Sequence, residues 1–295
     1  MLKDSLKVAV VQHTCSDDIE ANQEQIITAI EQAAAQGAKL ILLPELHNTL
    51  YFCQTEDTNN FDLAETIPGP STKQLGALAN DLEVVIVSSL FEKRAAGLYH
   101  NTVVVFDVDG DIAGTYRKMH IPDDPGFYEK FYFTPGDLGF TPIETSIGKL
   151  GVLICWDQWF PEAARLMALA GADILLYPTA IGWDPDDNKE EQARQKDAWV
   201  TIQRAHAIAN GLPVVVANRC GFEEDFSNHS KGIKFWGNSF ICGPQGEILA
   251  ESKQHPTIFT TTINMNRTES VRRNWPFLRD RRTDSYYDLL RTYID

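Results

Sequence analysis

The chain has 295 residues, 43% of them hydrophobic, which is enough apolar material to bury the core of a large enzyme domain. Its formal net charge of −15 opposes binding to a phosphate backbone, so we expect no nucleic acid partner. No apolar run approaches the ~20 residues that cross a bilayer, and the first residues lack the apolar stretch of a signal peptide. We therefore predict a soluble, cytoplasmic protein with no membrane partner.

The cysteine pattern bears on redox state and metal binding. The cysteines lie far apart, and the sequence contains neither a C-x-x-C pair nor a His/Cys cluster with zinc spacing. Reduced thiols fit this pattern, whereas a structural zinc site does not, and we expect neither a metal nor an organic cofactor. The five residues are Cys15, Cys53, Cys155, Cys220 and Cys242.

The first half of the chain alternates short apolar runs with amphipathic stretches. Apolar residues at helical spacing predict a helix over 22–36, which stops at Gly37, and another over about 72–81. Asp109-Gly110 predicts the turn of a hairpin within 101–118. Buried strands are expected over 7–12, 40–45 and 84–92.

The second half repeats this alternation. Helices are predicted over 161–171 and about 190–210, and a hairpin over 238–252 turns around Gln245-Gly246. Because hairpins interrupt the alternation, we predict an α/β layered sandwich with mixed sheets rather than a purely parallel sheet. No change in composition marks a linker, so residues 1–295 form one predicted domain. Further strands are expected over 149–155, 173–180, 213–219 and 256–265.

Glu45 ends one of the buried strands. In LILLPE it follows four apolar residues and a proline, at the carboxyl edge of a strand, where ligands of open α/β sheets bind. Burial there would raise the pKa of the carboxyl group and suit it to general-base chemistry. A strand-end glutamate is also common on protein surfaces, so Glu45 alone does not define a site.

Cys155 ends another apolar strand, immediately before a helix predicted from Pro161. A thiol at such a junction lies near backbone N–H groups and the positive end of a helix, which would lower its pKa and make it nucleophilic. Cysteine is also one of the most buried residue types, and inert packing is the alternative interpretation. The other four cysteines are assigned to packing, because no comparable polar and aromatic turn follows them.

Lys118 lies between these two residues, at the end of a hairpin strand. The loop that follows contains prolines, glycine and several aromatic residues, which is typical of an active-site wall. Acyl transfer from an amide requires a nucleophile, a proton shuttle and a positive group at the developing oxyanion. Cys155, Glu45 and Lys118 would supply these three functions.

Three motifs resemble the nitrilase superfamily of carbon–nitrogen hydrolases, and they occur in the order of that family. They are PELHN with Glu45, YRKMHIP with Lys118 and CWDQWFPEAAR with Cys155. The resemblance covers nearly the whole chain and implies a four-layer αββα sandwich and a Glu-Lys-Cys triad. It also implies a glutamate after the lysine, and Glu129 stands in that place as a positioning or secondary acid-base residue.

Within that superfamily, HIPDDPGFYEKFYFTPGD and YPTAIG most resemble the N-carbamoylputrescine amidases, which produce putrescine, carbon dioxide and ammonia. The β-ureidopropionases and other amidases of the superfamily share much of the pattern and remain alternatives. Carbamoylputrescine carries an ammonium, which would suit an aromatic channel with an acid at its far end. We predict channel walls from Tyr51, Trp156 and Trp183, and an ammonium partner in Asp123 or Asp184.

Two functions outside this interpretation stay open. A binding or scaffold protein could retain the fold without activity, although all three triad positions are filled. A Cys-His hydrolase of another kind would use a histidine as base, with candidates in His13, His47, His100, His120, His206 and His229.

Arginines and aromatic residues alternate near the C-terminus. Both kinds of residue are enriched in protein interfaces, so we expect residues 266–295 to form contacts in a homo-oligomer. A solvated tail is the alternative. The residues concerned are Arg272, Arg273, Trp275, Phe277, Arg279, Arg281 and Arg282.

Overall fold

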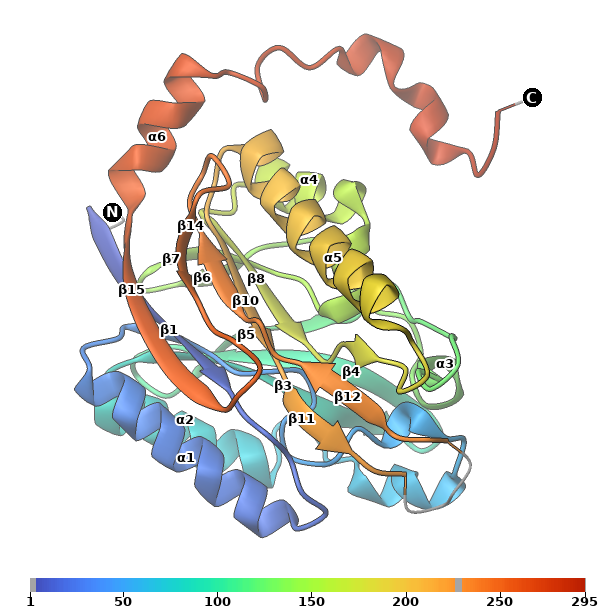
Figure 1. The fold of residues 1–295 in the computed structure, drawn as a ribbon. Coiled ribbons are helices and arrows are strands. Elements are labelled where there is room, and N and C mark those ends of the chain that lie inside the picture. The colour runs from blue at the N-terminus through green and yellow to red at the C-terminus, as the bar shows by residue number, and fades with distance from the viewer. Residues whose placement is uncertain (1–3, 226–229, 295) are drawn as a thin grey trace.

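The structure is a computed structural model that describes residues 4–225 and 230–294. Two six-stranded mixed sheets lie face to face, and a pair of helices covers the outer face of each sheet (Figure 1). This arrangement confirms the mixed α/β layered sandwich expected from the sequence. Among the described residues, no helix is both long and apolar enough to cross a membrane.

The first sheet has the strand order β15-β1-β2-β3-β4-β5. β1, β2 and β3 are parallel, and antiparallel pairing joins the remaining strands. Helices α1 (Ile19–Ala35) and α2 (Pro70–Leu82) lie on its outer face (Figure 1). The strands are β1 (Ser5–Gln12), β2 (Leu40–Leu42), β3 (Val85–Ala95), β4 (Leu98–Phe106), β5 (Ile112–Arg117) and β15 (Thr257–Asn264).

The second sheet has the order β14-β13-β10-β8-β7-β6, with β7, β8 and β10 parallel. Helices α4 (Pro161–Leu169) and α5 (Lys189–Asn210) cover its outer face (Figure 1). The Asn188 side chain caps α5, and Gly211 ends it with φ +58°. The strands are β6 (Ile143–Thr145), β7 (Gly148–Val152), β8 (Ile174–Thr179), β10 (Val214–Asn218), β13 (Phe240–Cys242) and β14 (Ile248–Glu251).

The alternation of side chains along β1 explains the layers. Val8 and Val10 belong to the core that also contains residues of the second sheet, such as Val152. The neighbouring Ala9 and Val11 belong to a separate core beneath α1 and α2. Because successive side chains of a strand point to opposite faces, one apolar strand supplies both layers.

A small third sheet lies beside the two large ones and was not predicted from the sequence. It has the order β11-β12-β9, in strands of two to four residues, which are too short to show a periodic pattern. Its strands are β9 (Gly182–Trp183), β11 (Cys220–Glu223) and β12 (Ile233–Trp236). The short helices are η1 (Phe52–Gln54), η2 (Thr58–Leu63), α3 (Glu129–Tyr132) and η3 (Cys155–Trp159).

The C-terminal segment leaves the sandwich after β15. It begins with α6 (Met265–Asn274) and continues through two short helices, η4 (Thr283–Ser285) and η5 (Tyr287–Leu290). In Figure 1 this red segment passes along the outside of α4 and α5. Many of its apolar side chains are exposed, Leu290 to 94%.

Candidate active site

Glu45 and Lys118 meet at one end of the first sheet, although they are 73 positions apart in the chain. Glu45 follows β2 and Lys118 follows β5, and both side chains are fully buried. Lys118 Nζ donates to Glu45 Oε1 at 2.7 Å and to Glu129 Oε2 at 2.6 Å. The three predicted charged residues therefore form one buried cluster.

The two oxygens of Glu45 have different surroundings. Oε1 accepts hydrogen bonds from Lys118 Nζ and from Asn101 Nδ2, each at 2.7 Å. Oε2 is buried and has no hydrogen-bond partner among the described residues. The carboxylate is thus held through one oxygen, which leaves the other available to accept a proton.

Cys155 follows β7 of the second sheet and begins η3. Its φ is +42°, an uncommon backbone conformation for a residue other than glycine. The Cys155 thiol lies within hydrogen-bond distance of the Ala180 carbonyl oxygen, at 3.8 Å. Asp157 stabilises this turn, because its carboxylate accepts from the backbone N–H of Ile154 at 2.9 Å and of His120 at 3.0 Å.

The expected lowering of the Cys155 pKa is wrong. Burial raises the pKa of this thiol well above its usual value, and the Glu45 carboxylate raises it further, whereas Lys118 acts in the opposite direction. The sequence argument considered the helix end but not the loss of solvent around a side chain that is 5% exposed. The thiol therefore needs a base to remove its proton.

Glu129 completes the charged cluster as the second carboxylate bound to Lys118. Its Oε1 accepts the Tyr51 hydroxyl at 2.6 Å. Burial raises the pKa of Glu129 to about 7, while Lys118 partly offsets that effect. Burial by itself would lower the pKa of Lys118, but the carboxylates of Glu129 and Glu45 raise it well above its usual value. Lys118 therefore remains an ammonium inside the protein.

A cavity of about 520 Å³ opens beside Cys155. Glu129 and Trp156 line it near the thiol, together with Trp236 of β12. The loop after β9 and the first turns of α5 also line it and contribute several acids and one arginine. The charged residues of this part of the lining are Asp184, Asp187, Glu191 and Arg194, and Asp124 joins them from the loop before α3.

Of the five predicted substrate-binding residues, only some line the cavity beside Cys155. Trp156 and Asp184 line the cavity. Tyr51 is buried behind Glu129, to which it donates its hydroxyl, and Trp183 packs against Trp236 with ring centroids 5.3 Å apart. Asp123 is exposed, and its neighbour Asp124 is the one that lines the cavity. Proximity to a motif in sequence does not fix the direction of a side chain.

Sequence reasoning missed several residues of this site. Asn101 lies within β4, shortly before the apolar run of that strand, and its polar side chain next to that run was the available signal. Glu191 lies in the first turn of α5, and the sequence gave no indication that its side chain faces the cavity. Trp236 lies in the third sheet, whose strands were not predicted.

Histidine chemistry at Cys155 finds no support among the described residues, because no histidine there is hydrogen-bonded to the thiol. His120, for example, is paired with Asp157 at 2.7 Å, and His206 bonds the Gln158 carbonyl oxygen at 2.8 Å. His229 lies outside the described residues. Within residues 4–225 and 230–294, no group of three or more His, Cys, Asp or Glu side chains could hold a metal ion.

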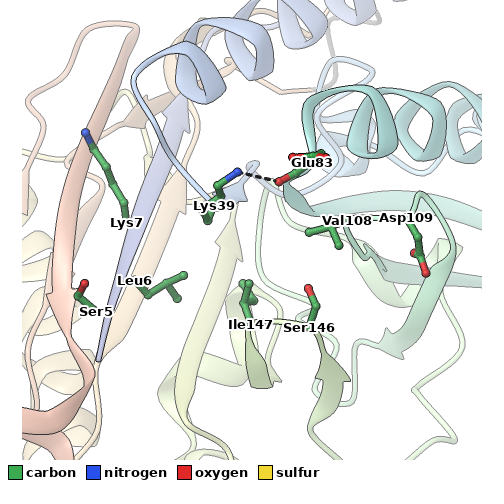
Figure 2. A pocket seen from close by; sticks show the side chains of 9 residues that line it. All are labelled: Ser5, Leu6, Lys7, Lys39, Glu83, Val108, Asp109, Ser146 and Ile147. Atoms are coloured by element: carbon green, nitrogen blue, oxygen red, sulfur yellow. Dashed lines mark hydrogen bonds between the residues drawn. The ribbon is translucent and has the colours of Figure 1, made fainter. Parts of the chain in front are cut away.

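A second cavity, of about 380 Å³, includes residues of β1 and of the turns after β4 and before β7 (Figure 2). Its lysines are Lys7 and Lys39, and Lys39 Nζ donates to the Glu83 carbonyl oxygen at 3.2 Å (Figure 2). Neither a cysteine nor a histidine lines it, so we assign the chemistry to the cavity beside Cys155.

Comparison with known proteins agrees with this geometry. The model of the carbon-nitrogen hydrolase family matches residues 7–273. The chain is 43% identical to an N-carbamoylputrescine amidase of Arabidopsis thaliana, over 96% of this chain and 94% of that protein. It is also 43% identical to a citrullinase of Francisella tularensis, over 98% of this chain and 99% of that protein.

A crystal structure of a carbon-nitrogen hydrolase from Helicobacter pylori superposes with a TM-score of 0.96. The two sequences are 54% identical, and the match covers 98% of this chain and 100% of that one. Since the similarity extends over almost the whole fold and includes the sheets that carry Glu45, Lys118 and Cys155, this chain belongs to the carbon-nitrogen hydrolase family.

Proposed function

We propose that this enzyme hydrolyses N-carbamoylputrescine to putrescine, carbon dioxide and ammonia, without a metal or organic cofactor. The observation that carries the proposal is the unpartnered Oε2 of Glu45, in a buried cluster with Lys118. The similarity to N-carbamoylputrescine amidases over nearly the full chain supports this choice of substrate.

In the first half-reaction, Glu45 takes the proton of the Cys155 thiol, and the sulfur attacks the ureido carbon. The carbonyl oxygen becomes an oxyanion, held by the Lys118 ammonium and the backbone N–H of Trp156. The raised pKa of Cys155 supports proton removal during attack rather than a thiolate at rest. The C–N bond then breaks, and ammonia leaves with the proton from Glu45.

In the second half-reaction, Glu45 activates a water molecule that attacks the S-carbamoyl carbon. The C–S bond breaks, Cys155 recovers its proton, and the released carbamic acid decomposes to putrescine and carbon dioxide. Glu129 serves as a positioning residue for Lys118, because its carboxylate lies 2.6 Å from Nζ. Tyr51 in turn orients Glu129 through its hydroxyl.

The charge of the cavity supports an ammonium at the far end of the substrate. Arg194 is bound to Glu191 at 2.6 Å and to Glu190 at 2.5 Å, so its charge is already compensated. Asp184 and Asp187 line the same cavity with Asp124, and these carboxylates would attract a cation. We assign the ammonium to this acidic end.

Arg194 also supports a second candidate substrate. Citrulline has a ureido group and, at its other end, both an ammonium and a carboxylate, and a guanidinium could bind that carboxylate. The 43% identity to a citrullinase fits the same idea. A carbamoyl β-amino acid, the substrate type of β-ureidopropionases, also carries a carboxylate. To bind it, Arg194 would have to break its ion pairs with Glu190 and Glu191.

Ammonia release tests these assignments directly. The purified enzyme is offered carbamoylputrescine, citrulline, carbamoyl-β-alanine and carbamoylcadaverine, and mass spectrometry follows a covalent adduct on Cys155. We expect the highest kcat/KM for carbamoylputrescine and a carbamoyl adduct on Cys155. A preference for citrulline would move the assignment to the second candidate, and no turnover of any ureide would identify a catalytically silent protein.

We propose further that the protein is a cytoplasmic homo-oligomer that uses residues 266–295 in subunit contacts. All five cysteines are free, which fits a reducing compartment. Tyr287 and Leu290 are 77% and 94% exposed, next to the half-exposed Leu166 and Leu169 of α4. Replacing Leu290 by Asp should lower the mass measured by light scattering, and an active wild-type monomer would refute the proposal.

A further inference from the structure

A buried ion pair lies beneath the segment that carries Glu45. Arg219 follows β10 and Glu223 ends β11, and the side chains of both are almost completely buried. Arg219 Nη1 donates to Glu223 Oε1 at 2.8 Å. Neither residue lines the cavity beside Cys155.

The Arg219 guanidinium binds the backbone of the segment from Glu45 to Thr49. Nε donates to the Glu45 carbonyl oxygen at 3.1 Å, and Nη1 donates to that of Thr49 at 2.9 Å. Nη2 donates to the Leu46 carbonyl oxygen. One rigid planar group thus fixes three carbonyls of a segment that lies outside helices and strands.

Glu223 holds the other end of the same segment. Its Oε2 accepts the backbone N–H of Tyr51 at 2.6 Å, while Oε1 is bound to Arg219. Tyr51 in turn donates its hydroxyl to Glu129. The ion pair therefore contacts the backbone of both residues that join this segment to the charged cluster.

The segment needs such support because its conformation is not intrinsically favourable. Leu46 has φ +48°, a region that side chains other than glycine rarely occupy. A buried guanidinium is also costly unless its donors are satisfied, and here carbonyl oxygens and Glu223 satisfy them. The hydrogen bonds between Arg219 and these carbonyl oxygens therefore serve two purposes in the folded state. They stabilise the strained turn at Leu46, and they satisfy the donors of the buried guanidinium.

The ion pair also connects the two large sheets. Arg219 extends from the end of β10, which is parallel to β8 and, through it, to β7, the strand that leads to Cys155. Glu45 follows β2 of the first sheet. By binding the Glu45 carbonyl, Arg219 fixes the position of the base relative to the sheet that carries the thiol.

We propose that Arg219 and Glu223 are positioning residues that hold Glu45 and Tyr51 in register with Cys155. This inference rests on the proposed role of Glu45 as the proton shuttle. The pair acts through the backbone, so its loss should slow proton transfer from Cys155 and leave substrate binding nearly unchanged.

The test compares Glu223→Gln and Arg219→Lys with the wild-type enzyme. Gln keeps the size of Glu223 but turns a donor toward Arg219, and Lys keeps the charge of Arg219 but cannot serve all four acceptors. We expect kcat and the single-turnover rate of Cys155 adduct formation to fall by about tenfold to a hundredfold, as for a misplacement near 1 Å. KM should stay within about threefold.

Leu75→Ala serves as the control for stability. Leu75 is buried in α2, in the core between the first sheet and its helices, which is a different core from the one that contains Leu46 and Tyr51. This variant should melt at a lower temperature, as the ion-pair variants do, yet keep wild-type kcat. Glu223→Asp, which can reach Arg219 or Tyr51 but not both, replaces Glu223→Gln if the latter does not fold.

Two results would overturn the inference. One is wild-type adduct formation in a folded Glu223 or Arg219 variant, and the other is an equal loss of kcat in Leu75→Ala. Glu45→Gln, measured in parallel, separates this failure from that of the proposed function. If Glu45→Gln keeps full activity, the role of Glu45 itself is wrong.

Discussion

Asn101 donates its side-chain amide to the oxygen of Glu45 that also accepts the Lys118 ammonium, at 2.7 Å. Ser89 orients Asn101 by donating its hydroxyl to Oδ1 at 3.1 Å. Oε1 thus has two donors, whereas Oε2 is buried without a hydrogen-bond partner among the described residues. Asn101 and Lys118 together determine which oxygen of the carboxylate remains free.

Replacing Asn101 by Ala should therefore reduce kcat. A hydrogen bond to a charged group is worth ~1.5–3 kcal/mol, which corresponds to a loss of about tenfold to a hundredfold. Steady-state kinetics with carbamoylputrescine would measure it. Thr102→Val is the matched control, since Thr102 is the next buried polar residue of β4 but bonds Glu92 instead. Equal rates for Asn101→Ala and the wild type would contradict the assignment.

Substitutions of the three proposed triad residues should reduce activity to different degrees. Cys155→Ala should abolish covalent adduct formation, and Glu45→Gln should remove turnover because the amide cannot accept the thiol proton. Lys118→Ala should lose at least ~10² in kcat through loss of an oxyanion donor. Mass spectrometry and ammonia release would record these effects, with circular dichroism as a check on folding. Full activity in any of the three variants would refute the proposed mechanism.

The acidic end of the cavity predicts charge selectivity. Asp184→Asn or Asp187→Asn should raise KM for carbamoylputrescine by about tenfold or more, the value of one charge-assisted hydrogen bond. N-butylurea lacks the ammonium, so its kinetics should change little. Asp123→Asn is the control, because that side chain is exposed and does not line the cavity. If neither variant discriminates between the two ureides, the ammonium binds elsewhere.

The buried His13 should make the free energy of unfolding depend on pH. Burial lowers its pKa from 6.5 to about 4, with a further contribution from Arg219. The unfolded chain therefore binds a proton at a higher pH than the folded protein does. The stability contributed by neutral His13 is present above pH 6.5 and is lost as the pH falls toward 4, by about 3 kcal/mol at most.

Urea unfolding at several pH values between 7 and 4.5 would measure this effect. His13→Asn should flatten the decline in the free energy of unfolding, although buried His47, whose pKa is also lowered, keeps part of it. His255 is exposed and provides the control substitution. A decline of the same slope in His13→Asn would exclude His13 as its source.

The sequence was sufficient for most strands of the two large sheets, although β6 was not predicted, and for the placement of Glu45, Lys118 and Cys155. Apolar strands are recognisable by composition, and Glu45 and Cys155 each end such a run, whereas Lys118 follows the second strand of a predicted hairpin. The supporting residues were not predictable in the same way. Arg219 is fully buried, contrary to the usual exposure of arginine, and it contacts the backbone of residues more than 170 positions away.

The direction in which a side chain points was the second property that could not be predicted from the sequence. Tyr51 and Asp123 lie near the motifs in sequence, yet Tyr51 points to Glu129 and Asp123 to solvent. The raised pKa of Cys155 depends on how completely the fold excludes water around the thiol, which no local pattern reports.

The proposed reacting groups are divided between the two large sheets, because Glu45 and Lys118 follow strands of the first sheet and Cys155 follows a strand of the second. The boundary between them is largely apolar, and apolar contact has no preferred direction. If one sheet moved by about 1 Å relative to the other, the secondary structure would hardly change, but the Glu45 carboxylate would be displaced from the Cys155 sulfur. A far-ultraviolet circular dichroism spectrum, which reports secondary structure, therefore does not show what fraction of a preparation is active. Titration of reactive Cys155 counts the molecules in which the two sheets are correctly positioned.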